Sequence, residues 1–165
     1  MWFVHRLVWF VFLILIQVLI LNHVHIGGYA MPICYIYYIF IINTGVPRKS
    51  LLLQSFLLGL CVDIFSNTPG INAASSTFLA FIRPKLLDVL LTRDVNEEIS
   101  PSIISMNFSP FLRYLLFGTF LHVFIVQLID TFSFVQIVPL FFRVITSTIT
   151  SVVLMICIDS IRRNK

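Results

Sequence analysis

Charged residues are scarce in this chain, and their scarcity excludes most classes of water-soluble protein. Asp, Glu, Lys and Arg make up 11% of the 165 residues, against about a quarter in an ordinary soluble domain. Hydrophobic residues make up 59%, and the mean hydropathy is +1.01. A soluble globule of this size could not cover so much apolar surface with so few charges. The composition therefore excludes a soluble enzyme and a disordered segment, and it predicts an integral membrane protein.

Other residue types and motifs are also scarce or absent. Glycine (6) and proline (7) are too few for a linker or a fibrous protein. The three cysteines, Cys34, Cys61 and Cys157, lie inside apolar runs without a C-x-x-C spacing, so we expect small buried hydrophobes rather than metal ligands. No Walker A, G-x-S-x-G or H-E-x-x-H motif occurs, and no carboxylate pair is placed for acid–base catalysis. We therefore expect no enzyme, metal site or cofactor.

Six continuous apolar stretches predict an all-α membrane protein with one polytopic domain over residues 1–165. A β-barrel is excluded because its strands would alternate polar and apolar residues. The first stretch is too long for the core of a signal peptide, and no A-x-A cleavage site follows it. Three stretches are shorter than the usual ~17–25 residues, so a re-entrant hairpin is the alternative for one pair. The six spans are expected at residues 7–21, 29–42, 51–65, 70–82, 111–129 and 139–158.

The distribution of basic residues predicts the orientation. If both termini are cytoplasmic, ten of the eleven basic residues fall on the cytoplasmic side, including Arg48, Lys49, Arg83 and Lys85. The positive-inside rule favours this arrangement, with a cytoplasmic loop at residues 92–109. The cytoplasmic-face basic residues could bind anionic lipid or cytoskeletal partners. Because they flank apolar runs and do not cluster on one element, we expect no nucleic-acid partner.

A few polar residues lie within the predicted spans, where charge is costly. Arg143 could form an ion pair with Asp63 or Asp130, or could extend its guanidinium to the membrane interface instead. His122 and Asp130 share one helix face, which is weak support for a proton relay. Three glutamines are expected to form interhelical hydrogen bonds instead, namely Gln17, Gln54 and Gln127.

The third and fourth spans are predicted to form a tight hairpin. Ser55, Gly59 and Asp63 recur every four residues and so share one helix face, where small residues let helices approach closely. The connection is short and rich in turn-forming residues, namely Asn67, Pro69 and Gly70. Asp63 lies beside this turn. It either caps the loop structurally or contacts a ligand or partner.

The hairpin resembles the signature of a bacterial family, the rod shape-determining protein MreD. The resemblance extends over essentially the whole chain, including its length, its uncleaved first span and its basic C-terminus. The motif as a whole is moderately specific, whereas its first part, G-L-x-x-D, would be weak evidence alone. It is carried by Gly59-Leu60, Asp63-Ile64-Phe65-Ser66, Pro69-Gly70 and Asn72-Ala73-Ala74.

This resemblance implies a scaffold rather than a catalyst. MreD proteins belong to the cell-wall elongation machinery that maintains rod shape, in the bacterial cytoplasmic membrane. They pair with the single-span protein MreC. That complex is linked, directly or indirectly, to the MreB filament, the RodA glycosyltransferase and a penicillin-binding transpeptidase. The family's fold resembles the six-helix substrate-binding subunits of energy-coupling factor transporters. Gly59, Asp63 and Gly70 match the motif, but the resemblance supplies no established site residues.

The shared fold supplies the alternative function, a substrate-binding membrane subunit of a vitamin or metal transporter. Such subunits carry an alanine-x-x-x-alanine face on the first helix that docks the coupling subunit. The first span here contains no Ala or Gly. That departure favours the scaffold. An unrelated small membrane chaperone or assembly factor is a third option.

Overall fold

A computed structural model describes residues 2–23, 31–90, 98–131 and 137–163, and these residues form helices and connecting segments, with no strand among them. Five of the helices are long and three elements are short. In chain order they are α1 (Trp2–Leu19), η1 (Leu21–His23), α2 (Tyr37–Ile41), α3 (Arg48–Ser66), α4 (Ile71–Leu90), α5 (Ile103–Met106), α6 (Phe108–Thr131) and α7 (Ile137–Arg163).

Three helices of the described chain are long and apolar enough to cross a membrane. They contain the segments Arg48–Ser66, Phe108–Asp130 and Leu140–Arg162. The apolar segment of α1, Leu7–Leu19, is shorter. Helix α4 has 20 residues but carries three charged ones, Arg83, Lys85 and Asp88. The chain is therefore an all-α protein with helices suited to a membrane.

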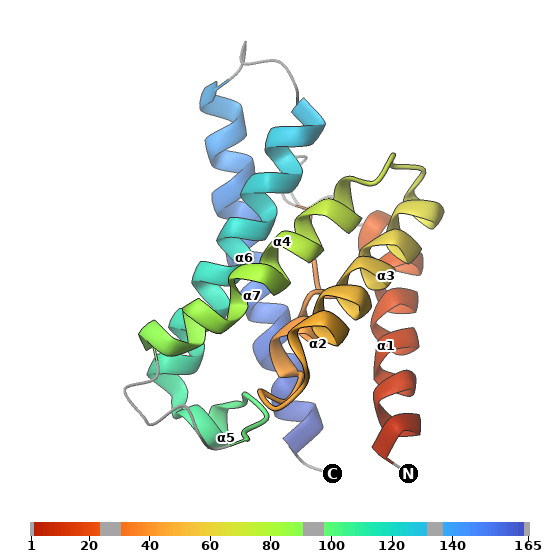
Figure 1. Cartoon of the computed structure of the whole chain (residues 1–165). Helices are drawn as coiled ribbons and strands as arrows, with labels where there is room; N and C mark the ends of the chain where they lie inside the picture. Colours follow the sequence, from red (N-terminus) through yellow and green to blue (C-terminus); the bar gives the residue numbers. More distant parts are fainter. Residues whose placement is uncertain (1, 24–30, 91–97, 132–136, 164–165) are drawn as a thin grey trace.

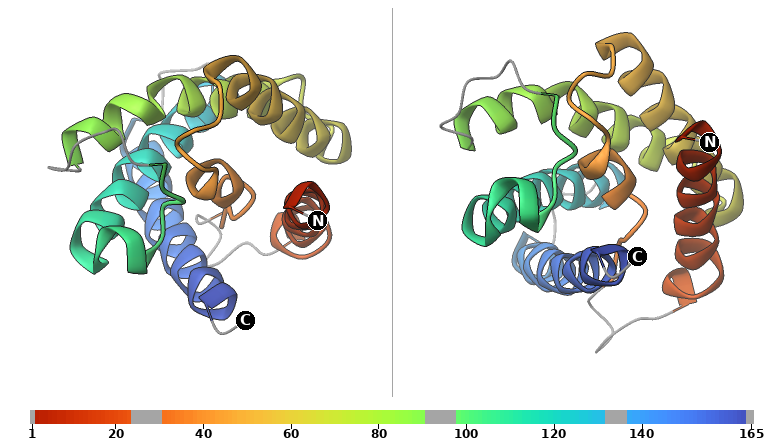
Figure 2. Two further views of the ribbon diagram at one scale, coloured as in Figure 1. Left: turned by 60° about the horizontal axis from the view of Figure 1, so that its bottom comes forward. Right: turned by 90° about the horizontal axis from the view of Figure 1, so that it is seen from below.

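The helices form two hairpins that cross each other (Figure 1). Helices α3 and α4 pack along their lengths, as do α6 and α7, and α4 crosses α6. Helix α1 packs against α3 and α2 and stands apart from α6 and α7 (Figure 2). The start of α1 and the end of α7 lie at the same end of the molecule, whereas the α3–α4 turn lies at the opposite end.

The core is centred on the segment before and within α2. The largest fully buried side chains include Tyr35, Tyr37 and Phe40, together with Phe111 and Tyr114 of α6. The rings of Phe40 and Tyr114 pack edge to face with centroids 5.0 Å apart. Such pairs add stabilisation beyond the area they bury. The aromatic segment therefore fills the space that the two hairpins enclose.

The expected second span, residues 29–42, is not a helix in the described part of the chain, which begins at residue 31 there. Residues 31–36 are irregular, and α2 has only five residues. Irregular backbone at membrane depth is tolerated only when it is buried within protein and hydrogen-bonded. Residues 32–40 are all buried, so this segment meets the first condition.

The expected fourth span, residues 70–82, ends too early. Helix α4 continues through Pro84 to Leu90. Proline removes one helical hydrogen bond and favours a helix end at the residue before it. Arg83 nevertheless lies within the helix and is only 3% exposed. Its guanidinium makes hydrogen bonds inside the bundle, and these tertiary contacts outweigh the local stop signal.

The other four expected spans match helices with different ends. The clearest differences are that α6 begins at Phe108 and that α7 continues to Arg163. The expected loop at residues 92–109 lies partly outside the described residues, which resume at residue 98. The remainder of that loop contains the short helix α5 and the first two residues of α6.

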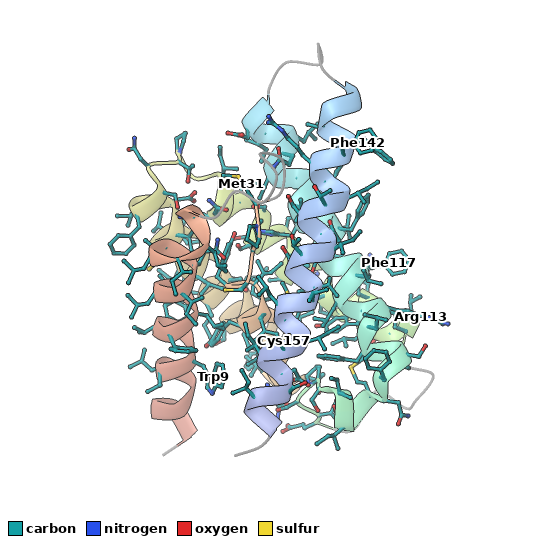
Figure 3. All side chains as sticks on the ribbon, turned by 180° about the vertical axis from the view of Figure 1, so that it is seen from behind. Trp9, Met31, Arg113, Phe117, Phe142 and Cys157 are labelled. Atoms are coloured by element: carbon teal, nitrogen blue, oxygen red, sulfur yellow. The ribbon has the colours of Figure 1, made fainter. Side chains whose placement is uncertain are left out.

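Large apolar side chains point outward from several helices (Figure 3). Phe117 of α6 is 57% exposed and Phe142 of α7 is 61% exposed. Within the 18-residue apolar windows of the three candidate spans, only 33–39% of residues are buried inside the protein. A soluble protein of this size rarely exposes contiguous apolar surface on such a scale. This outer surface is suited to contact with lipid.

Candidate functional site

The α3–α4 hairpin brings the motif residues together. A Cβ atom at Gly59 would lie 2.4 Å from the carbonyl oxygen of Asn72 and 2.5 Å from the Cα of Ala73. Only glycine allows the two backbones to approach so closely. Ser55, Gly59 and Asp63 are all buried on the face that α3 turns toward α4, as predicted.

The turn of the hairpin uses left-handed backbone at two positions. Asn67 ends α3 with φ 54°, and Gly70 precedes α4 with φ 78°. Asparagine and glycine are the residues that adopt this conformation most readily. Pro69 lies between them and is exposed. These residues reverse the chain within four positions, so the turn residues predicted from the sequence have a structural role.

Asp63 caps the start of α4 from the preceding helix. Its carboxylate accepts hydrogen bonds from the backbone N–H groups of Asn72, at 3.0 Å, and Ala73, at 2.8 Å. The Thr68 hydroxyl and the Asn72 side-chain amide also donate to it. The first N–H groups of a helix have no partner within the helix and carry partial positive charge. Asp63 therefore has the structural, capping arrangement that the sequence left as one of two alternatives.

A chain of hydrogen bonds runs from this cap into the core. The Tyr35 hydroxyl donates to the side-chain oxygen of Asn72 at 2.9 Å. The same hydroxyl lies 2.9 Å from Nε2 of His122, which is fully buried in α6. The sequence offered only weak support for a relay between His122 and Asp130, and in the structure the partner of His122 is Tyr35. The sequence could not reveal this partner, because 87 residues separate His122 from Tyr35 and only the three-dimensional fold brings them together.

Side chains of two helices satisfy the irregular backbone of residues 31–36. The Gln17 side chain accepts from the N–H of Cys34 at 2.8 Å and donates to the carbonyl of Pro32 at 3.2 Å. The Ser151 hydroxyl of α7 accepts from the N–H of Ile33 at 2.8 Å. Ser147 accepts from the N–H of Met31 at 3.0 Å. Unpaired buried backbone groups would be costly here, so these contacts allow the segment to be non-helical.

Two of the three glutamines expected to form interhelical hydrogen bonds connect different elements, and the side-chain oxygen of the third has no described partner. Gln17 connects α1 to the irregular segment, and Gln54 of α3 accepts from the Tyr38 hydroxyl of α2 at 2.8 Å. Gln127 is 6% exposed, but its side-chain oxygen has no hydrogen-bond partner among the described residues.

Of the four basic residues expected on one membrane face, three are exposed and one is not. Arg48, Lys49 and Lys85 are exposed. The guanidinium of Arg83 donates to the backbone carbonyls of Phe40 and Ile42, and to the Tyr114 hydroxyl. Arg83 therefore holds the end of α2 against α4 and α6, and it is not a lipid-binding surface residue.

Of the two alternatives for Arg143, the ion pair with Asp63 or Asp130 is not formed. Arg143 and Asp130 are both exposed, and the hairpin's own groups occupy the carboxylate of Asp63. The ion pair found in the described chain instead joins Arg162 to Asp159 at 3.4 Å, near the end of α7. Sequence reasoning overlooked Asp159.

Asp159 connects three elements at the end of the molecule where the termini lie. It is 3% exposed and accepts hydrogen bonds from the Tyr37 hydroxyl at 2.6 Å and from the N–H of Ile103 at 3.3 Å. Arg162 also lies over the Tyr37 ring. A buried carboxylate needs such partners, and these hold α2, α5 and α7 together.

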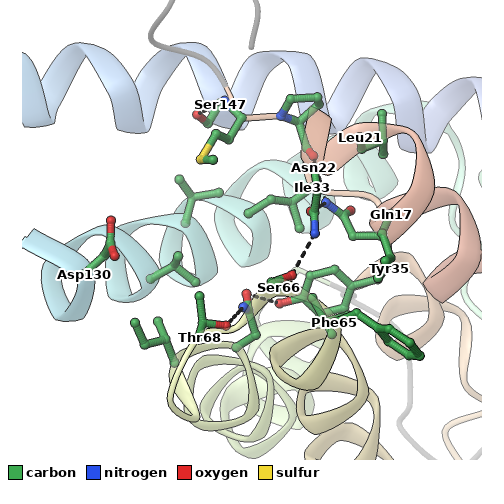
Figure 4. Close-up of a pocket in the computed structure, with 18 of the residues that line it drawn as sticks. Gln17, Leu21, Asn22, Ile33, Tyr35, Phe65, Ser66, Thr68, Asp130 and Ser147 are labelled. Carbon is green, nitrogen blue, oxygen red and sulfur yellow. Dashed lines mark hydrogen bonds between the residues drawn. The ribbon is translucent and has the colours of Figure 1, made fainter. Parts of the chain in front are cut away.

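A cavity opens at the opposite end of the molecule, beside the hairpin turn (Figure 4). Its volume is about 440 Å³. Five long helices, η1, the α3–α4 turn and the irregular segment contribute side chains to it. Its walls are mostly apolar, and its polar lining residues are Gln17, Asn22, Tyr35, Ser66, Thr68, Asn72, Gln127, Asp130 and Ser147.

The described residues offer no candidate metal centre. No group of three or more His, Cys, Asp or Glu side chains converges among them. The three cysteines are free, and only Cys34 is buried as predicted, whereas Cys61 is half-buried and Cys157 is exposed. Cys157 therefore lies on the outer surface of α7 and is not a core residue.

No family model, curated protein or solved structure matches this chain. The site is therefore interpreted from its own geometry and from the motif residues that the hairpin brings together.

Proposed function

We propose that this protein is a non-catalytic membrane scaffold of the MreD type. The observation that carries the proposal is the hairpin geometry. The motif residues Gly59, Asp63 and Gly70 act together in one structural unit, where they allow close helix packing, cap α4 and reverse the chain. A resemblance due to chance composition would not need to place its residues in one contact network.

The proposed setting is the bacterial cytoplasmic membrane, with six crossings and both termini in the cytoplasm. The irregular segment at residues 31–36 together with α2 would be one crossing, buried within the bundle. The proposed direct partner is an MreC-like single-span protein. The MreB filament, the RodA glycosyltransferase and the penicillin-binding transpeptidase would be linked through it. Arg48, Lys49 and Lys85 would contact anionic lipids at the cytoplasmic face.

We assign the partner's single span to the exposed face of α1. This helix has neighbours on one side only, and its other side presents apolar residues at helical spacing, including Val8, Val11, Phe12, Leu15 and Leu19. A second membrane helix could pack along this stripe by van der Waals contact.

Site-specific photo-crosslinking tests this assignment. A photoreactive amino acid at Phe12 of α1 should crosslink to a single-span protein in native membranes. The matched control is Phe124 of α6, an exposed aromatic residue on another helix. Equal crosslinking of the partner from both positions would contradict the assignment to α1.

The cavity favours one alternative function, the substrate-binding subunit of an energy-coupling factor type transporter. A volume of about 440 Å³ lies within the range of small-molecule sites. Depletion of the protein separates the two functions. The scaffold predicts that rod-shaped cells become round. The alternative predicts unchanged shape with loss of uptake of a small solute.

A further inference from the structure

Some polar groups that line the cavity beside the hairpin turn already have hydrogen-bond partners in the protein, and others do not. The side-chain amide of Gln17 donates to Asn22 and to the Pro32 carbonyl. The amide of Asn22 donates to Ser66, and the amide of Asn72 donates to Asp63 and Thr68. Most hydrogen-bond donors of the cavity wall are therefore already paired with protein acceptors.

Two acceptors in the cavity lining have no partner among the described residues. The side-chain oxygen of Gln127 is buried and has no partner among the described residues, although Gln127 lines the cavity. Asp130 lines the same cavity one helical turn further along α6, and no described residue forms an ion pair with it. Residues three apart lie on the same face of a helix. Gln127, whose amide oxygen is unpartnered, and Asp130 thus line one cavity from the same face of α6.

The charge of the lining also selects the ligand. Among the described residues that line the cavity, Asp130 is the one charged residue, and none is Lys, Arg or His. An anionic ligand would meet a carboxylate without a compensating cation. A neutral ligand would gain no charge–charge attraction from that carboxylate, which is exposed to solvent in the free protein. A protonated amine supplies both the positive charge and the hydrogen-bond donors that the two acceptors lack.

The remaining walls set the shape of the ligand. They are apolar and include Val18, Val62, Phe65, Ile71 and Val123. We propose that this cavity binds a small amphiphile whose ammonium group lies between Gln127 and Asp130 and whose apolar part contacts these walls. The proposal does not rest on the scaffold function.

Two sources could supply this chemistry, the ethanolamine headgroup of a membrane phospholipid or a soluble amine. Titration calorimetry of the purified protein in detergent, with 2-phenylethylammonium as the probe, tests the shared chemistry. 2-Phenylethanol and 3-phenylpropionate are the neutral and anionic controls. We expect the ammonium compound to bind at least about tenfold more tightly than either, as expected for a charge-assisted hydrogen bond.

Variants identify the site. Asp130→Asn and Gln127→Leu should each weaken binding of the probe by about tenfold. Asp88→Asn removes an exposed carboxylate on α4 that does not line the cavity, so it should leave the affinity unchanged. Equal affinity for the three probes, or an Asp130→Asn affinity equal to that of the unmodified protein, would overturn the proposal.

Native mass spectrometry of the protein released from nanodiscs distinguishes the two sources. Retention of phosphatidylethanolamine, but not phosphatidylcholine, by the unmodified protein and its loss in Asp130→Asn would identify the headgroup, because a quaternary ammonium has no N–H donor. Binding of the soluble probe without retained phosphatidylethanolamine would identify a soluble amine. Binding of neither would overturn the proposal.

Discussion

At the scale of single residues, Asp63 shows how a carboxylate is accommodated between membrane-suited helices without a cationic partner. Four donors from the start of α4 and its preceding turn surround it. The partial positive charge of a helix N-terminus takes the place of a lysine or arginine. The sequence located Asp63 beside its turn and included capping among its roles, with an ion pair to Arg143 as one alternative.

Removing this cap should destabilise the protein. Asp63→Ala leaves the N–H groups of Asn72 and Ala73 without their acceptor, which should cost about 2–3 kcal/mol. The melting temperature in detergent should fall by roughly 5–10 °C. Asp88→Ala is the control, because Asp88 is exposed and has no comparable contacts. Equal melting temperatures for the two variants would refute the capping role.

Gly59 should tolerate no side chain. Gly59→Ala places a methyl group within 2.4–2.6 Å of the α4 backbone, so α3 and α4 must separate. We expect a loss of about 1–3 kcal/mol, measured by thermal unfolding. Gly45→Ala is the matched control, because a Cβ there meets only the side chain of Glu98, which can move. A larger loss in the control than in Gly59→Ala would argue against close helix packing.

At the scale of elements, the segment at residues 31–36 differs most from the sequence-based expectation. Its apolar run predicts a membrane helix. The structure instead shows irregular backbone held by Gln17, Ser147 and Ser151. Local sequence could not reveal this, because the serines are more than 110 residues away along the chain. Pro32 within the run was the available signal.

Ser151 should be required to hold this segment. Ser151→Ala leaves the buried N–H of Ile33 unpaired. Hydrogen–deuterium exchange of peptides covering residues 31–40 should become faster, because opening of the segment costs less free energy. Ser160→Ala, an exposed position on α7, should leave this exchange unchanged. If Ser151→Ala also leaves the exchange rate of these peptides unchanged, the serine does not hold the segment.

Helix α4 illustrates a second limit of local reasoning. Arg83 and Pro84 read as a membrane-flanking stop, yet the helix continues past them. The reason is the pair of carbonyl groups at the end of α2, those of Phe40 and Ile42, to which Arg83 donates. The early end of the expected second helix thus explains why α4 continues past Pro84. Neither feature is visible in a short window of sequence.

At the scale of the whole molecule, hydrophobic runs identified most long helices, and the small-residue spacing identified the α3–α4 hairpin. These features depend on local composition, so the sequence contains them. The cavity and the hydrogen bonds of His122 and Asp159 depend on how distant elements pack. They follow only from the three-dimensional arrangement.

The expected topology has a direct test at the two ends of α3. Pro47 and Pro69 are both exposed and flank this helix. In a variant lacking Cys34, Cys61 and Cys157, a membrane-impermeant thiol reagent should label Pro69→Cys from outside the cell. Pro47→Cys should react only after the membrane is opened. Epitope tags at both termini should likewise become accessible to antibody only after the membrane is opened. Labelling of both cysteines from outside would contradict the six-span topology.

Affinity purification from native membranes in mild detergent, followed by mass spectrometry, tests the central claim most directly. The scaffold account predicts recovery of a single-span protein with an extracytoplasmic body, together with wall-synthesis enzymes. Recovery of a coupling membrane subunit with two ATPases would contradict it and would make the chain a transporter's substrate-binding subunit.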